Sequence, residues 1–116
     1  MDSAKITDDG GVTKQILQEG TGDLPPKGKK VFVTYIGKFE DGKIFDQSDS
    51  SDPFVFTLGA GEVIKGWDLG VATMKKGERS VFTIKSEYAY GDKGTGPIPG
   101  KATLVFEVEL LKFYIK

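Results

Sequence analysis

The chain has 116 residues, which suffice for one domain with a single hydrophobic core. Its 16 basic and 17 acidic residues are interspersed, and this balance argues against a nucleic-acid-binding face or a polybasic membrane patch. Cysteine and histidine are absent, so the sequence offers no disulfide, no thiolate, none of the usual zinc ligands and no histidine general base.

The N-terminal segment is polar. Residues 1–11 end in Asp8-Asp9-Gly10-Gly11 and are predicted to form a flexible lead-in to one domain spanning residues 12–116. The N-terminus has no apolar signal region, and no run of 18 apolar residues occurs anywhere in the chain. We therefore expect a cytoplasmic or nuclear protein that does not enter a membrane.

Most of the remaining chain has the pattern of β-strands separated by Gly, Pro and Asp turn signals. A hairpin is predicted at Asp41-Gly42, because this pair accepts the positive φ angles of a tight turn. The polar run at residues 47–53 interrupts one return strand. The predicted strands are residues 12–18, 30–39, 44–46 continued at 54–58, 79–85 and 102–113, with Leu104, Phe106, Val108 and Leu110 facing inward.

Residues 61–74 are the only helix candidate. Four apolar residues recur on one stripe of this helix, namely Ile64, Trp67, Val71 and Met74. Gly66 and Gly70 limit it to about two or three turns, because each interior glycine costs roughly 1 kcal/mol relative to alanine. A helix this short needs support from β-structure. The predicted fold class is therefore α+β, with a curved antiparallel sheet of about five strands wrapped around one short helix.

Two inorganic sites can be tested against the sequence. Asp46, Asp49 and Asp52 lie three residues apart, but a calcium loop of the EF-hand type would need glycine and glutamate where Ser51 and Thr57 stand. Residues 91–96 are rich in glycine but do not match the order of a phosphate-binding loop, and two prolines follow where a helix would have to begin. We expect neither a metal nor a nucleotide.

Residues 86–101 contain four glycines and two prolines, and they are predicted to be an irregular binding loop. The chain also has eight phenylalanines, four tyrosines and one tryptophan. Phe32, Phe56 and Phe82 suit a core, whereas Tyr88 and Tyr90 lie in the glycine-rich segment. A pocket with Trp67 as its floor and tyrosine hydroxyls at its rim would suit an apolar ligand that carries carbonyls. A plain aromatic core without a pocket is the alternative.

Five stretches, taken together and in order, closely resemble the FKBP-type peptidyl-prolyl cis/trans isomerases, the immunophilins that bind tacrolimus and rapamycin. The stretches are Phe45-Asp46, residues 62–67 (Glu-Val-Ile-Lys-Gly-Trp), 70–72 (Gly-Val-Ala), 88–91 (Tyr-Ala-Tyr-Gly) and 102–106 (Ala-Thr-Leu-Val-Phe). The resemblance runs from about Val12 to Leu111. It implies the family's half-open β-sheet around a short helix.

The resemblance also implies a set of site residues. Trp67 matches the floor beneath the substrate proline. The backbone N–H of Ile64 and the hydroxyl of Tyr90 match donors to ligand carbonyls, and Asp46 matches the pocket carboxylate. The matching walls are Tyr35, Phe45, Phe54, Val63, Ile64, Tyr90, Ile98 and Phe106. Two positions depart from the family pattern: Ser51 replaces an arginine that pairs with the aspartate, and the loop 91–99 is one residue shorter.

The implied partners are proline-containing peptides and proteins, the macrolides tacrolimus and rapamycin, and a phosphatase or kinase reached through the drug complex. A monomer without a cofactor, nucleic acid or membrane partner is expected. The lead-in resembles the start of the first domain of larger immunophilins, some of which carry tetratricopeptide tails that bind a chaperone. The chain is in that case one domain of a longer protein.

An isomerase of this kind needs no covalent or acid–base chemistry. The barrier of about 18–20 kcal/mol to rotation of a peptide bond comes from amide resonance. A dry aromatic site disfavours the planar, dipolar amide more than the twisted one, and the N–H of Ile64 and fixed aromatic walls would be complementary to the twisted form. The alternative function is a docking or chaperone-type module that keeps the fold without turnover.

Overall fold

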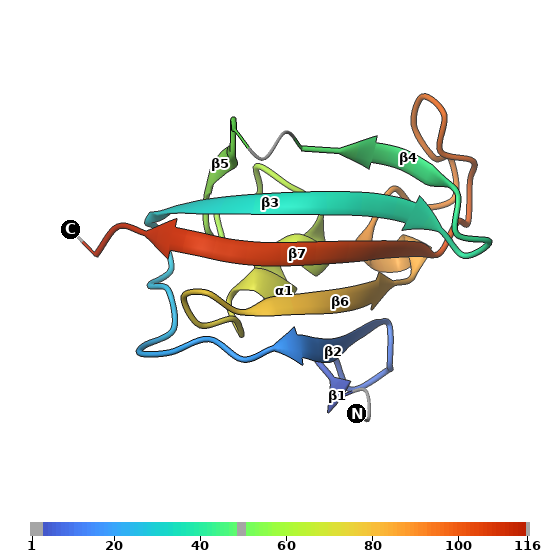
Figure 1. The fold of residues 1–116 in the computed structure, drawn as a ribbon. Helices are drawn as coiled ribbons and strands as arrows, with labels where there is room; N and C mark the ends of the chain where they lie inside the picture. The colour runs from blue at the N-terminus through green and yellow to red at the C-terminus, as the bar shows by residue number, and fades with distance from the viewer. Residues whose placement is uncertain (1–3, 49–50, 116) are drawn as a thin grey trace.

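The computed structural model describes residues 4–48 and 51–115. These residues form one sheet of seven strands with a single short α-helix against its inner face (Figure 1). No helix among them is both long and apolar enough to cross a membrane. The elements are β1 Ala4–Lys5, β2 Val12–Gln18, β3 Lys30–Phe39, β4 Ile44–Gln47, β5 Phe54–Thr57, α1 Lys65–Val71, β6 Arg79–Ile84, the 3₁₀ helix Ser86–Tyr88 and β7 Leu104–Phe113.

The strands are antiparallel and lie in the order β1-β2-β6-β7-β3-β4, with β5 also paired to β3. Strand β3 is therefore the centre of the fold, since it pairs with β4, β5 and β7. Gly37 of β3 lies opposite Asp46 of β4 on one side and Phe106 of β7 on the other. A Cβ at Gly37 would stand 2.8 Å from ring atoms of both Phe45 and Phe106, so glycine leaves room for these two rings.

The α+β prediction is confirmed, but the sheet has seven strands instead of about five. The predicted return strand is two strands, β4 and β5, which both pair with β3 at different places. The sequence predicts no strand in the lead-in, whereas Ala4–Lys5 pairs with β2. A pair this short has no alternation by which sequence could reveal it. The segment 86–101, predicted to be wholly irregular, begins with one turn of 3₁₀ helix.

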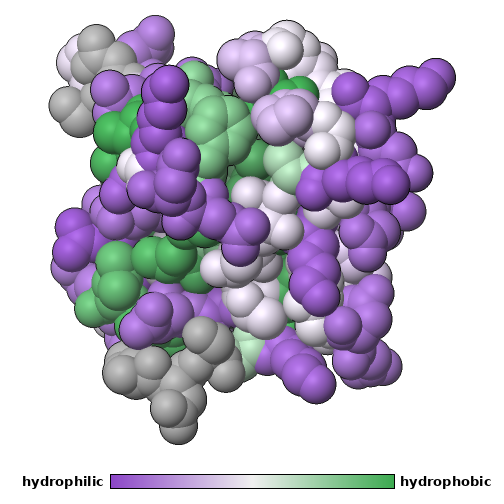
Figure 2. Space-filling view, turned by 90° about the vertical axis from the view of Figure 1, so that its right-hand side faces the viewer, coloured by the Kyte–Doolittle hydropathy of each residue, from purple (hydrophilic) through white to green (hydrophobic). Residues whose placement is uncertain are grey.

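Helix α1 is shorter than the predicted residues 61–74, and its first residue is Lys65. Gly59 and Gly61, which precede it, have positive φ and are therefore not helical. Of the predicted apolar stripe, Trp67 and Val71 lie in the helix and are buried in the core. Met74 is also buried but follows the helix, and Ile64 precedes the helix and is only partly buried. The inward residues predicted for the last strand, Leu104, Phe106, Val108 and Leu110, are likewise all buried. Figure 2 shows the right-hand end of the view in Figure 1, where hydrophilic residues surround smaller hydrophobic areas.

One ion pair is buried beside the C-terminal end of α1. Lys14 Nζ lies 2.6 Å from Glu78 Oε2, and the two side chains are only 8% and 5% exposed. Lys14 also donates to the carbonyl of Thr73, 3.0 Å away, just beyond the helix. Glu78 accepts from the Ser80 hydroxyl at 2.8 Å. The pair thus ties β2 and β6 to the end of the helix, where a cation is favourably placed.

Replacement of Lys14 by methionine should lower the free energy of unfolding by about 3–5 kcal/mol, because the carboxylate of Glu78 would remain buried without its cation. Urea denaturation followed by circular dichroism measures this change. The matched control is Lys43→Met at an exposed position, which should stay within about 0.5 kcal/mol. Equal stabilities of the two variants would show that the buried pair has no net role in folding.

Candidate functional site

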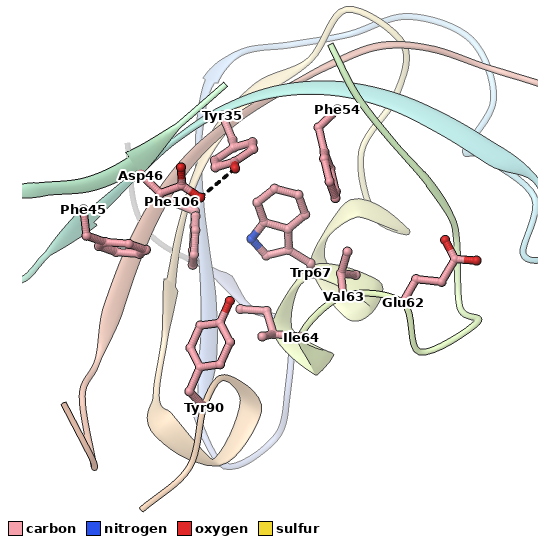
Figure 3. A pocket seen from close by; sticks show the side chains of 10 residues that line it. All are labelled: Tyr35, Phe45, Asp46, Phe54, Glu62, Val63, Ile64, Trp67, Tyr90 and Phe106. Carbon is pink, nitrogen blue, oxygen red and sulfur yellow. Dashed lines mark hydrogen bonds between the residues drawn. The ribbon is translucent and has the colours of Figure 1, made fainter. Parts of the chain in front are cut away.

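A cavity of about 250 Å³ opens between α1 and strands β3, β4, β5 and β7 (Figure 3). Most of its wall is aromatic or aliphatic, with two carboxylates and two phenol hydroxyls. Such a site suits an apolar ligand with a few polar atoms. The lining residues are Tyr35, Phe45, Asp46, Phe54, Glu62, Val63, Ile64, Trp67, Tyr90 and Phe106.

Trp67 projects from the first turn of α1 and meets rings from three strands. Its ring centroid lies 4.9 Å from that of Tyr35, 5.3 Å from that of Phe106 and 5.7 Å from that of Phe54, all at steep interplanar angles. Edge-to-face pairs at these distances are favourable and fix the plane of the indole. Trp67 Nε1 is the only buried side-chain polar atom without a hydrogen-bond partner that is found among the described residues.

Asp46 stands at the exposed edge of the cavity and is held by Tyr35. The Tyr35 hydroxyl donates a hydrogen bond of 2.8 Å to Asp46 Oδ2 (Figure 3). Burial of the phenol, together with this hydrogen bond and the negative charge of Asp46, raises the pKa of Tyr35 to about 12. The hydroxyl therefore stays protonated and keeps the carboxylate oriented at any physiological pH.

Two further lining residues, Tyr90 and Ile64, each carry a hydrogen-bond donor. The ring of Tyr90 reaches in from the loop after the 3₁₀ helix, with its hydroxyl directed towards Ile64 and Trp67 (Figure 3). Burial, and then the charge of Asp46, raises the pKa of Tyr90, so its hydroxyl also remains protonated near neutrality. Ile64 immediately precedes α1, and its carbonyl oxygen accepts a hydrogen bond from the backbone N–H of Trp67 at 3.0 Å. No bond from the Ile64 N–H itself is found in the described part of the chain.

The segment that leads into α1 is fixed by two carboxylates. Asp68 of the helix accepts hydrogen bonds from the backbone N–H groups of Gly59 and Gly61, at 2.8 and 3.1 Å. Glu62 accepts from the N–H of Thr57 at 2.9 Å. Glu62 also lines the cavity, although it is not among the predicted site residues. It falls within the stretch 62–67 that carries the family resemblance, so its position in that stretch is the signal that could have indicated it.

Of the ten residues predicted for the site, nine line this one cavity. The tenth, Ile98, is only 6% exposed and packs with the core, because the chain turns back between Thr95 and Ile98. Asp49, the middle residue of the rejected metal pattern, lies outside the described residues. Within the described ranges, no cluster of three acidic residues is placed to hold a metal ion.

A second hollow of about 270 Å³ includes Arg79, Glu107 and Glu109 in its lining and shares only Tyr35 with the first. It lacks the convergent aromatic rings of the first cavity. The aromatic cavity is therefore the stronger candidate for the functional site.

Comparison with known proteins shows the family of the chain. Residues 22–111 match the family model of the FKBP-type peptidyl-prolyl cis-trans isomerase. The chain belongs to this family. This FKBP-type domain is similar to a crystal structure of the peptidyl-prolyl cis-trans isomerase of Pseudomonas syringae pv. tomato, with a TM-score of 0.84 and 38% sequence identity. The match covers 96% of this chain and 80% of the Pseudomonas chain.

Curated relatives fall into two sizes. Human peptidyl-prolyl cis-trans isomerase FKBP4 is 56% identical over 108 residues, which are 90% of this chain but 24% of the human protein. The bovine protein of the same name is 57% identical over the same share of its length. FK506-binding protein 1 of Dictyostelium discoideum is 52% identical over 105 residues, which are 89% of this chain and 98% of that protein. The FKBP-type domain thus spans about a quarter of the mammalian relatives and nearly all of the other.

The protonation states of the site give a prediction for this FKBP-type domain. Its kcat/KM for prolyl isomerisation should be flat between about pH 6 and 8.5, because the chain has no histidine or cysteine and the pKa values of Tyr35 and Tyr90 are raised further from neutrality. The rate in deuterated solvent should be nearly the same. A bell-shaped profile within this interval, or a large solvent isotope effect, would show that proton transfer takes part.

Proposed function

We propose that this FKBP-type domain accelerates rotation about Xaa-Pro bonds in the aromatic cavity, and that tacrolimus and rapamycin bind there. The observation that carries the proposal is the single apolar floor, Trp67, enclosed edge-on by Tyr35, Phe54 and Phe106. A proline ring is compact, apolar and of a size that such a floor can accommodate. No catalytic nucleophile or cofactor is needed for the rotation.

The catalytic effect follows from the difference between planar and twisted amides. A planar amide carries the larger dipole, so transfer from water into an apolar cavity disfavours it more than it disfavours the twisted transition state. In this proposal the backbone N–H of Ile64, a residue that lines the cavity, donates to a substrate carbonyl while the proline ring rests on Trp67. A reduction of the barrier by about 7 kcal/mol corresponds to roughly 10⁵-fold acceleration.

Each polar group has a proposed role in holding the substrate. The Tyr90 hydroxyl donates to a second carbonyl, and the Tyr35 hydroxyl is already engaged with Asp46. Asp46 remains a rim group that shapes the cavity and takes no proton from the substrate. Asp46 and Glu62 give the lining a negative character. Apolar residues before proline should therefore bind better than acidic ones, which the two carboxylates repel.

Exchange NMR or a protease-coupled assay should show faster isomerisation of a Leu-Pro peptide than of the matched Glu-Pro peptide. Phe54→Leu, at a partly exposed rim position, should lower kcat/KM by roughly 10- to 100-fold, because misplaced positioning groups cost rates of this order. The control is Phe32→Leu, which lies on the same sheet but alternates to the opposite face of β3 and packs on Tyr114.

Absence of acceleration for both peptides by the folded chain would contradict the enzymatic proposal. It would leave the docking or chaperone-type module as the function of the cavity. An equal loss of activity in Phe32→Leu and Phe54→Leu would instead show that the site is wrongly located.

The drug part of the proposal is supported by the printed name of the Dictyostelium relative, an FK506-binding protein, and by two donors that suit ligand carbonyls. The chain has one tryptophan, so emission of Trp67 reports directly on the cavity floor. Titration with tacrolimus should change this emission. Tyr90→Phe should weaken binding by about 3- to 10-fold, the range for one ordinary hydrogen bond.

Tyr114→Phe is the matched control for the hydroxyl, because Tyr114 packs against Phe32 on the outer face of the sheet. Its affinity for tacrolimus should equal that of the parent chain. If tacrolimus produces no change in emission and no measurable heat in calorimetry, the drug proposal is contradicted. The isomerase proposal would still depend on its own assay.

A further inference from the structure

The segment before β2 folds into a compact turn whose carboxylate reaches a distant tyrosine. Asp9 Oδ1 accepts from the Thr7 hydroxyl at 2.7 Å and from the N–H of Gly11 at 2.9 Å. The Thr7 hydroxyl in turn accepts from the N–H of Val12 at 3.1 Å. The second oxygen of Asp9 accepts from the Tyr88 hydroxyl at 2.8 Å, across 79 positions of sequence.

The same turn also contacts Tyr88 through the backbone. A Cβ at Gly11 would lie 2.3 Å from Cε2 of Tyr88, so the ring rests directly on this glycine. The carbonyl of Gly11 accepts from the N–H of Lys85 at 2.8 Å. The lead-in therefore holds the start of the 3₁₀ helix by a backbone bond, a ring contact and one side-chain hydrogen bond.

Tyr88 is two residues before Tyr90, whose ring lines the cavity. The chain between them is short and tightly bonded: the carbonyl of Ser86 accepts from the N–H of Gly91 at 2.8 Å. The carbonyl of Gly91 accepts from the N–H of Lys101 at 2.9 Å, which closes the base of the loop 91–101. These bonds connect the segment of Tyr88 to the base of this loop and to Tyr90.

We propose that Asp9 and Tyr88 are positioning residues for the cavity, and that the hydrogen bond between them sets the affinity for carbonyl-bearing substrates by holding the segment that presents the Tyr90 hydroxyl. Neither residue lines the cavity. The proposal rests on the function proposed above for that cavity. It gives the N-terminal lead-in a role in substrate binding that its polar, glycine-rich sequence does not suggest.

The charge state of Asp9 suits this role. Its hydrogen bonds, above all that from Thr7, lower the pKa of Asp9 to about 2, so the group is a carboxylate throughout the neutral range. A carboxylate is a stronger acceptor for a phenol than a neutral oxygen is. The same bond raises the pKa of Tyr88, which keeps the phenol protonated as the donor.

The test compares Asp9→Ala, Tyr88→Phe and the double variant with the parent chain. Tyr88→Phe keeps the ring on Gly11 and removes only the hydroxyl, and Tyr114→Phe is its control. Amide hydrogen exchange at Gly91 and Lys101 should speed up about three- to tenfold in both single variants, a factor typical of one lost hydrogen bond. The double variant should show no further increase, because both changes remove the same bond.

The catalytic readout is coupling to Tyr90. In the parent chain, Tyr90→Phe removes the contribution of the hydroxyl to KM for a Leu-Pro peptide. In the Asp9→Ala background, Tyr90→Phe should raise KM by a factor that is about three- to tenfold smaller than the factor in the parent chain, with kcat nearly unchanged. If Asp9→Ala only loosened the fold, Tyr90→Phe would change KM by the same factor in both backgrounds.

The two proposals can fail separately, because hydrogen exchange needs no catalysis. Unchanged exchange at Gly91 and Lys101, or effects of Asp9→Ala and Tyr90→Phe that simply add, would overturn the positioning role while the parent chain remains active. Faster exchange in the variants, together with a parent chain that fails to accelerate isomerisation, would overturn the isomerase assignment and with it the claim about substrate affinity.

Discussion

The site depends on how closely α1 approaches the sheet. Gly66 and Gly70 face β6, and a Cβ at either position would stand 2.6–2.8 Å from the side chain of Ile84 or Phe82. Without these Cβ atoms the helix lies close enough to β6 for Trp67 to reach rings on three strands. The glycines that shorten the helix by their low helix propensity therefore also place the floor of the cavity.

The core and the site share side chains. Trp67 and Phe106 are 5% and 4% exposed and belong to the hydrophobic core, yet both line the cavity. Rigid neighbours hold such residues in one orientation, which is what a site without chemical catalysts requires. Catalysis by shape and desolvation has no reactive group to compensate for poor geometry. Two interactions lie outside the cavity: the buried Lys14–Glu78 pair beside the end of α1, and the Asp9–Tyr88 hydrogen bond, to which we assign the positioning role proposed above.

Periodic spacing of apolar residues predicts the helix and most of the strands, and the family resemblance predicts most of the residues that line the cavity. The stripe through Trp67 and the inward face of the last strand are visible as spacings of apolar residues. The missing parts lack such a signal. Lys14 resembles a surface lysine until its partner 64 residues away is known, and Asp9 resembles a linker residue. The resemblance assigns Ile98 to a wall, whereas in the structure Ile98 packs with the core and is not among the residues that line the cavity.

The central claim is that an Xaa-Pro bond rotates while the proline rests on Trp67. It is tested most directly by two-dimensional NMR on a mixture of the chain and a Leu-Pro peptide, with both the peptide and the indole N–H of Trp67 observed. The account predicts exchange peaks between cis and trans peptide together with a shift of the indole resonance that saturates at the same peptide concentration. Exchange peaks without any change at Trp67 would contradict it, because rotation would then occur elsewhere on the molecule.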